Sequence, residues 1–217
     1  MPTHLQREIE NVKKRVLHLS ALVEDRVQRA LEAVLRRDEG VARKIIDSDI
    51  EIDTLEVEIE EECLKVLALH QPVAVDLRFL IGAIKLNHDL ERLGDQAVSI
   101  AKQATHLAGG EKADIPADLP ELGRKSIAML KKSLDAFVNM DQKLARQVCA
   151  DDDEVDALNR KISSEVQANM RQNPERIDQL LRVLSTSRHL ERVADHATNI
   201  AEDVVYMTQG EIVRHKV

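Results

Sequence analysis

The chain has 217 residues, 43% of them hydrophobic and 32% charged, and its formal net charge is −8. The acidic balance and the scarcity of aromatic residues (two Phe, one Tyr and no Trp) argue against a nucleic-acid-binding protein, which needs a basic face and aromatic side chains on which bases stack. A composition rich in aliphatic and charged residues, with only seven Gly and five Pro, is typical of long helices.

The first half of the chain has the pattern of three helices, because apolar residues recur at steps of three and four. The first predicted helix covers about residues 5–37 and is interrupted at Asp38. The second continues to about His70. Pro72 opens the third, where its missing N–H costs nothing, and that helix ends near residue 107.

The second half repeats this pattern after a predicted linker at residues 109–118, the segment in which Gly-Gly and proline come together. Three further helices are expected at about residues 119–140, 141–171 and 174–207, the last two capped by Asp141 and by the Asn173-Pro174 pair. Short turns make neighbouring helices antiparallel. We therefore predict an all-α fold of two tandem, structurally similar three-helix bundles, at residues 1–108 and 119–217.

The two halves are related by an internal repeat. Leu90–Ala101 (LERLGDQAVSIA) recurs as Leu190–Ala201 (LERVADHATNIA), with seven of twelve positions identical. Upstream, a D-x-x-x-D motif at residues 49–53 recurs at residues 152–156, at an offset of 103 and not 100. The turn between the two motifs is therefore three residues shorter in the second half. A duplicated unit of this length indicates two domains of one kind, not a short-period solenoid.

Each half should bring four carboxylates together. Residues four apart stack on one face of a helix. In an antiparallel hairpin, residues equidistant from the turn lie level, so turns at residue 72 and between residues 173 and 174 place Asp53 opposite Glu91 and Asp156 opposite Glu191. Carboxylates so close repel one another, and bridging multivalent cations would relieve the repulsion. The candidate metal ligands are Asp49, Asp53, Glu91, Asp95, Asp152, Asp156, Glu191 and Asp195.

The first cluster has two possible additional ligands, Glu56 and His88, where the second half has Asn159 and Arg188. We therefore expect the first site to hold metal more tightly. The acids point away from the apolar stripe of their helix, so each cluster should lie in a surface groove and not at the bundle centre. Oxygen ligands without cysteine favour iron, manganese, magnesium or calcium, and do not forbid zinc.

The compartment can also be predicted from the sequence. No apolar run approaches the length of a membrane-spanning helix, and the N-terminus is too charged for a signal peptide. The two cysteines, Cys63 and Cys149, lack metal or redox spacing and fit a reducing cytosol. Both fall among apolar helical positions, where we expect them to be buried as small hydrophobic side chains.

Two other interpretations of the acidic pairs stay open. Acidic residues on long helices often only solvate a polar face, which would make the protein a metal-free helical adaptor. A di-metal carboxylate enzyme is the other alternative, but its helical form needs Glu-x-x-His on two helices, and none of the eight histidines has a Glu three residues before it. Metal content separates the first alternative from a metal-binding protein, and turnover would reveal an enzyme. We expect no enzymatic activity.

The chain resembles the PhoU family over almost its whole length. The resemblance lies in the two three-helix repeats, in the segment Cys63–Arg78 (CLKVLALHQPVAVDLR) and in the doubled LERxGD-type motif. It implies that the eight acids bind multinuclear metal clusters on the bundle surface, with iron among the metals. Two positions depart from the family pattern: Ala194 replaces the motif glycine of the second repeat, and Gln96 stands where a histidine is common.

The resemblance also implies a function. Members act as negative regulators of the phosphate-starvation response and in phosphate homeostasis. They link a phosphate ABC transporter, through its ATPase component, to a membrane sensor histidine kinase. This implies a cytoplasmic homodimer that protein partners recruit to the inner face of the membrane.

Overall fold

The computed structural model describes residues 4–109 and 114–209, and in these two ranges the chain forms helices without any strand. The helices are α1 (His4–Arg36), α2 (Glu39–Asp47), α3 (Ile50–His70), α4 (Ala74–Ala108), α5 (Leu119–Asn139), α6 (Gln142–Gln172) and α7 (Ile177–Gln209), with a short 3-10 helix, η1 (Pro174–Arg176), before α7. The predicted all-α fold is confirmed. Residues 110–113 of the predicted linker lie outside the described ranges, so the division at residues 109–118 stays a prediction.

Equivalent aspartates begin α2 and α6. The Asp38 carboxylate accepts a hydrogen bond of 3.0 Å from the backbone N–H of Val41, and Asp141 accepts one of 3.0 Å from that of Leu144. Each bond satisfies an N–H that the first turn of a helix leaves without an intrahelical partner. The predicted cap at Asp141 is therefore confirmed, and Asp38 does the same in the first half.

The prediction of one continuous second helix is wrong, because the chain turns at Ser48 and Asp49 between α2 and α3. The backbone N–H and the hydroxyl of Ser48 both donate to the carbonyl of Ile45, which closes a tight turn and ends α2. The second half has Asp151 and Asp152 at these positions, and α6 continues through them. Pro72 also precedes its helix, since α4 begins at Ala74.

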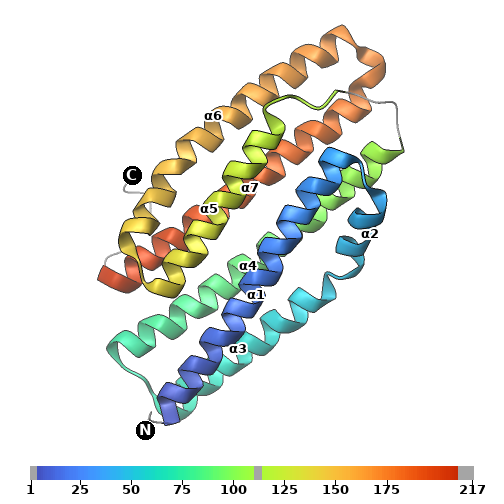
Figure 1. Ribbon diagram of the computed structural model, residues 1–217. Coiled ribbons are helices and arrows are strands. Elements are labelled where there is room, and N and C mark those ends of the chain that lie inside the picture. Colours follow the sequence, from blue (N-terminus) through green and yellow to red (C-terminus); the bar gives the residue numbers. More distant parts are fainter. Residues whose placement is uncertain (1–3, 110–113, 210–217) are drawn as a thin grey trace.

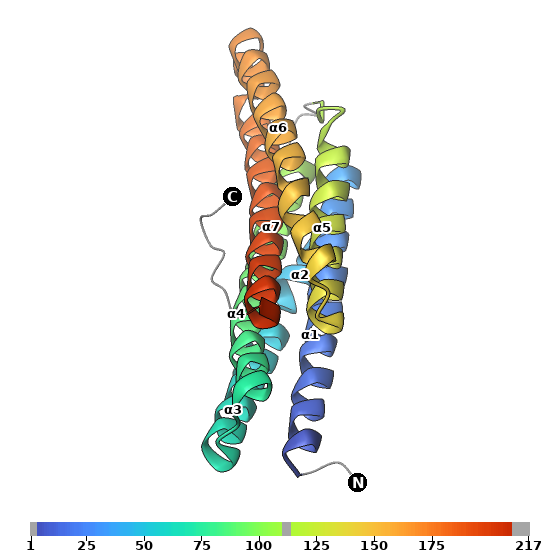
Figure 2. The same ribbon diagram turned by 90° about the vertical axis from the view of Figure 1, so that its left-hand side faces the viewer.

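Four helices form the centre of the molecule (Figures 1 and 2). Helix α1 lies along α5, and α4 lies along α7, so that each half contributes two central helices. The α2–α3 pair covers one flank and α6 covers the other. Within the described ranges, no helix combines the length and the apolar character needed to cross a membrane.

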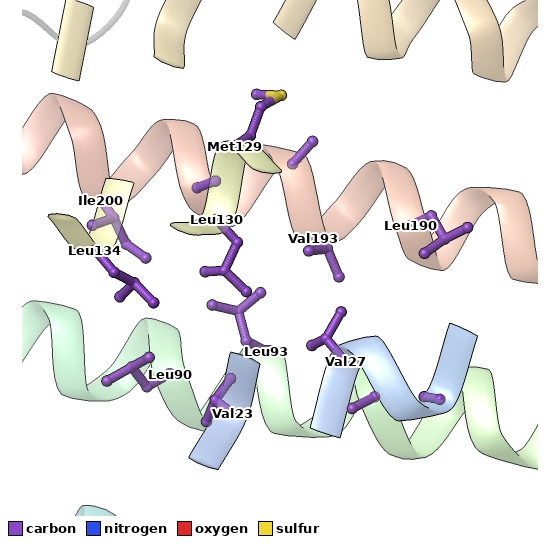
Figure 3. Close-up of a cluster of buried hydrophobic side chains, with 14 of the residues drawn as sticks. Val23, Val27, Leu90, Leu93, Met129, Leu130, Leu134, Leu190, Val193 and Ile200 are labelled. Atoms are coloured by element: carbon purple, nitrogen blue, oxygen red, sulfur yellow. The ribbon is translucent and has the colours of Figure 1, made fainter. Parts of the chain in front are cut away.

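The two halves share one hydrophobic core. Buried side chains from α1, α4, α5 and α7 gather in a single cluster between the halves (Figure 3). The repeated motif supplies equivalent residues from both sides, namely Leu90 and Leu93 from α4 and Leu190 and Val193 from α7. The apolar positions of the motif therefore join the halves, which leaves the opposite side of each motif helix for its acidic positions.

The glycine of the motif allows α3 to approach α4 closely. A Cβ atom at Gly94 would lie 2.9 Å from Cδ1 of Ile52, which is closer than two carbon atoms pack. The second half has Ala194 in place of this glycine and, at the repeat offset, Val155 in place of the isoleucine. In the second half, α6 thus has one methylene fewer at Val155, and α7 has one methyl group more at Ala194.

We expect Leu93→Ala to destabilise the protein by about 2–5 kcal/mol, since it removes a fully buried side chain from the cluster between the halves. Urea unfolding followed by circular dichroism measures the change. Leu181→Ala is the matched control, because Leu181 is 47% exposed and its truncation should cost little. An equal, small effect of both substitutions would show that the two halves do not depend on a shared core.

Candidate metal centres

The acidic motifs lie on two equivalent pairs of antiparallel helices, each joined by a short turn. We call the line of contact between α3 and α4 the first groove, and that between α6 and α7 the second groove. Because Leu90 and Leu93 point into the shared core, Glu91 and Asp95 lie on the side of α4 that faces away from it. Glu91 is half-buried and Asp95 is exposed, as are Glu191 and Asp195 at the equivalent positions.

The carboxylates of the first groove influence one another across the two helices. Burial raises the pKa of Asp49, and the negative charges of Asp53 and Asp95 raise it further. Burial also raises the pKa of Glu91, and the negative charges of Asp95 and Asp53 raise it further. These charge effects couple Asp49 with Asp95 and Glu91 with Asp53 across α3 and α4, which are the pairs that the turn positions predict.

The second groove holds the more strongly perturbed carboxylate. Burial, and then the charges of Asp195, Asp156, Asp153 and Glu191, raise the pKa of Asp152 from 3.8 to about 6. Its Oδ1 atom is buried and has no hydrogen-bond partner among the residues that the structure describes. A buried carboxylate oxygen without a donor is costly, and a cation is the kind of ligand that would satisfy it.

Burial is also the main cause of the raised pKa values of Glu191 and Asp195, and the charge of Asp156 raises both further. Asp156 itself forms an ion pair of 3.0 Å with Arg160, one turn further along α6. Three of the four carboxylates of this groove thus bind their protons more tightly than free side chains do. The four are held close enough for mutual repulsion to matter.

The two predicted additional ligands flank the first cluster. Glu56 and His88 line a surface depression together with Asp53, Glu91, Val57 and Arg92. Nε of Arg92 donates a long hydrogen bond of 3.5 Å to Nε2 of His88. In the second half, the neutral amide of Asn159 takes the place of the Glu56 carboxylate, and its oxygen accepts a hydrogen bond of 2.9 Å from the Ser187 hydroxyl.

A buried arginine that the sequence analysis did not single out lies beside the first cluster. Arg26 of α1 is only 3% exposed, donates to Glu51 over 2.7 Å, and opposes the rise in the pKa of Asp49. Its Nη1 atom is buried without a partner in the described part of the chain. The equivalent residue is Met129, so the first cluster has an internal positive charge that the second lacks. This charge acts against the expectation that the first site holds metal more tightly.

His189 and His196 do not join the acidic clusters, and both contact the other half. Nδ1 of His189 lies 2.9 Å from Oε1 of Gln96, and Nδ1 of His196 lies 3.0 Å from Oδ1 of Asp89. At the motif offset of 100, position 189 corresponds to position 89 and position 196 to position 96. Both contacts therefore join the same two motif positions, with the two halves exchanged. Gln96, the departure from the family pattern, is therefore part of the contact between α4 and α7.

The side-chain positions set a limit on the metal interpretation. Among the described residues, no group of three or more His, Cys, Asp and Glu side chains lies close enough together to hold a metal ion as placed. The set of oxygen donors suits hard cations, and the Asp152 oxygen without a partner fits such a ligand.

Comparisons with known proteins agree on one family. A family model described as the PhoU domain matches residues 16–104 and again residues 119–204. A protein of Clostridium acetobutylicum named phosphate-specific transport system accessory protein PhoU homolog is 35% identical over 96% of this chain and 95% of its own length. A homolog of the same name in Pseudomonas aeruginosa is 37% identical over 96% of this chain and 86% of its own length.

Solved structures show the same similarity. The crystal structure of PhoU from Pseudomonas aeruginosa superposes with a TM-score of 0.91 at 36% identity, over 94% of this chain and 99% of that one. The phosphate transport system regulatory protein PhoU from Streptococcus pneumoniae gives a TM-score of 0.89 at 32% identity, over 97% and 99% of the two chains.

The raised pKa of Asp152 predicts a pH-dependent stability of the metal-free protein. The folded-state pKa of about 6 lies above the ordinary value of 3.8, so this group stabilises the fold at low pH, and that stability is lost as the pH rises through 6. In the presence of a chelator, Asp152→Asn should therefore be more stable than the unsubstituted protein at mildly alkaline pH, by about 1–2 kcal/mol after solvent screening.

Thermal unfolding at several pH values measures this difference, which should disappear below a pH of about 4. Asp135→Asn is the control, because Asp135 is an exposed aspartate on α5 whose charge is not among the causes of the raised pKa of Asp152. A pH-independent difference between Asp152→Asn and the unsubstituted protein would contradict the electrostatic origin.

Proposed function

The chain belongs to the PhoU family, and we propose that it is an accessory protein that regulates uptake through a phosphate-specific transport system. The observation that carries the proposal is similarity from end to end: both halves match the PhoU domain, and relatives named as accessory proteins of such a system align over 96% of the chain. The conserved architecture extends to a structure described as a phosphate transport system regulatory protein.

We propose a finer role from the family resemblance. The protein would act in the cytoplasm as a negative regulator of phosphate-starvation signalling, and would link the ATPase component of a phosphate ABC transporter to a membrane sensor histidine kinase. Protein partners would recruit it to the inner face of the membrane. We also propose a homodimer. A regulator of this kind needs docking surfaces and no catalytic centre.

We propose that each groove binds two or more cations bridged by the carboxylates of its two motifs. The repetition of the arrangement, the raised pKa values and the Asp152 oxygen without a partner support this proposal. The oxygen donors favour iron, and manganese, magnesium, calcium or zinc would also be accepted. The bound cations would supply positive charge between carboxylates that otherwise repel one another.

The positive charge of bound cations would affect how neighbouring helices are held together. Asp49 and Asp95 belong to different segments, as do Asp152 and Asp195, so their repulsion acts between neighbouring helices. Neutralising the acids would hold α3 against α4 and α6 against α7. Metal content would thereby set how firmly the two outer flanks are fixed to the shared core, whose apolar contacts do not involve the acids.

One observation favours a second candidate, the metal-free helical adaptor. In the described ranges the acidic side chains do not converge as ligands, and Asp156 already has an arginine partner. In this alternative the grooves are solvated faces, and regulation depends on protein contacts alone. The metal content of the purified protein distinguishes the two candidates.

The regulatory proposal predicts the result of a gene deletion. Cells that lack the protein should express phosphate-responsive genes in phosphate-rich medium, because the negative regulator is absent, and a plasmid copy should restore repression. A reporter fused to a phosphate-responsive promoter measures the response. Normal repression in a deletion strain without a second copy of the gene would overturn the proposal.

The metal proposal predicts which substitutions empty which groove. Glu91→Ala with Asp95→Ala should abolish metal binding in the first groove only, and Glu191→Ala with Asp195→Ala in the second only. Elemental analysis of protein purified without a histidine tag measures the content. The metal-bound protein should also melt at higher temperature, since binding at a hundredfold excess over Kd adds about 2.7 kcal/mol. If the unsubstituted protein retains no metal after incubation with ferrous, manganous and zinc salts, the clusters do not exist.

A further inference from the structure

Helix α3 presents large apolar side chains to solvent at regular spacing. Ile50 is 73% exposed, Val57 is 51% exposed and Leu64 is 52% exposed. They are seven residues apart, which is close to two helical turns, so they lie on one side of the helix. We name these three residues the α3 stripe. Helix α3 lies at the edge of the molecule, with α1 and α4 on its inner side (Figure 1).

The second half of the chain shows that the fold does not require this stripe. At the repeat offset of 103, the three positions fall on α6, where they are also exposed. The residues there are Asp153, Arg160 and Gln167. Two copies of one helix thus occupy equivalent places, and only the copy in the first half keeps apolar residues on its outer side. A role outside the folded monomer explains this difference, because exposed apolar side chains contribute little to the monomer's own stability.

The surroundings of the α3 stripe contain more acidic than basic residues, although Lys65 and Arg92 lie near it, and this balance differs from that of the second half. Glu58, Glu60 and Glu61 flank the stripe and are exposed, whereas the equivalent residues on α6 are Lys161, Ser163 and Ser164. Glu58 forms an ion pair with Arg15 of α1. Glu60 and Glu61 form none with any residue that the structure describes, so their charges are available to a partner.

We infer that the α3 stripe is a docking surface for an amphipathic helix of a partner protein that has lysine or arginine on both sides of its apolar face. Apolar residues at steps of seven are the pattern by which two helices pack along each other, and flanking charges select the partner. A second copy of α3 would place acidic flanks against acidic flanks, which opposes pairing. An anionic membrane surface would be repelled for the same reason.

The length of the stripe sets the size of the docked helix. Ile50 and Leu64 are separated by about 21 Å along the helix axis at 1.5 Å per residue, so the partner helix needs about four turns. Val57 also lines the depression that contains Asp53, Glu56 and His88. The docked helix would therefore lie along the edge of the first acidic cluster. The inference depends neither on metal in that cluster nor on the proposed role in phosphate uptake.

A synthetic peptide tests the inference with the full-length protein. The probe is a fluorescein-labelled amphipathic helix with leucines at three- and four-residue steps and lysines on both sides of them, and its control has glutamate in place of every lysine. Fluorescence anisotropy should show saturable binding of the lysine peptide at one site per chain. The glutamate peptide should not bind, and high salt should weaken the lysine peptide because the flanking charges contribute.

Substitutions that copy the second half locate the site. Val57→Arg with Leu64→Gln gives α3 the residues that α6 has, and should weaken binding of the lysine peptide at least about tenfold, because two apolar contacts are lost. Ile177→Arg with Leu181→Gln is the matched control, since these apolar residues are also exposed but lie on α7. The control should bind as the unsubstituted protein does. Circular dichroism confirms that both variants are folded.

Three results would overturn the inference. The first is binding of the lysine peptide that the α3 substitutions do not weaken, or no binding at all. The second is a dimer in sedimentation experiments that dissociates in the Val57→Arg, Leu64→Gln variant, which would assign the stripe to a second copy of the chain. The third is binding to phosphatidylglycerol vesicles that the same variant loses, which would assign it to a membrane surface.

Discussion

The apolar contact between α4 and α7 is the constraint on which the rest of the structure depends. Leu90 and Leu93 of α4 and their repeat counterparts Leu190 and Val193 of α7 belong to one core that both halves share. Because this contact fixes how each motif helix is rotated about its axis, it also determines that the acidic residues of the motif face outward, toward α3 in one half and α6 in the other. The core thus supplies the free energy that keeps repelling carboxylates next to one another.

The two grooves differ in the charge that lies next to their mutually repelling carboxylates. In the first, the buried guanidinium of Arg26 offsets part of the negative charge near Asp49. In the second, Met129 stands in that place, and the pKa of Asp152 rises to about 6. The duplicated halves therefore kept their carboxylates while the charge beneath them diverged. The outer sides of the equivalent helices α3 and α6 differ as well. That of α3 carries apolar and acidic residues, whereas that of α6 is polar.

Features that depend on local chemistry could be predicted from the sequence. The cap at Asp141 needs only its own side chain and the N–H of Leu144, and the pairing of Asp49 with Asp95 follows from antiparallel geometry once the turn is placed. The break at Ser48 was missed because apolar residues continue at helical spacing on both sides of it, with Ile45 before the turn and Ile52 after it. Arg26 was missed because its neighbours come from helices that are distant in sequence, and the docking of the two halves determines the partners of His189 and His196.

The contacts His189–Gln96 and His196–Asp89 bear on how such a chain can evolve. They are a single self-complementary contact that occurs twice about an approximate twofold axis. In a dimer of identical subunits, any substitution changes both occurrences at once, because the interface is the same on both sides. Within one continuous chain each occurrence mutates separately. One contact joins His196 to the carboxylate of Asp89, and the other joins His189 to the neutral amide of Gln96, so the two occurrences differ in a way that a homodimer does not allow.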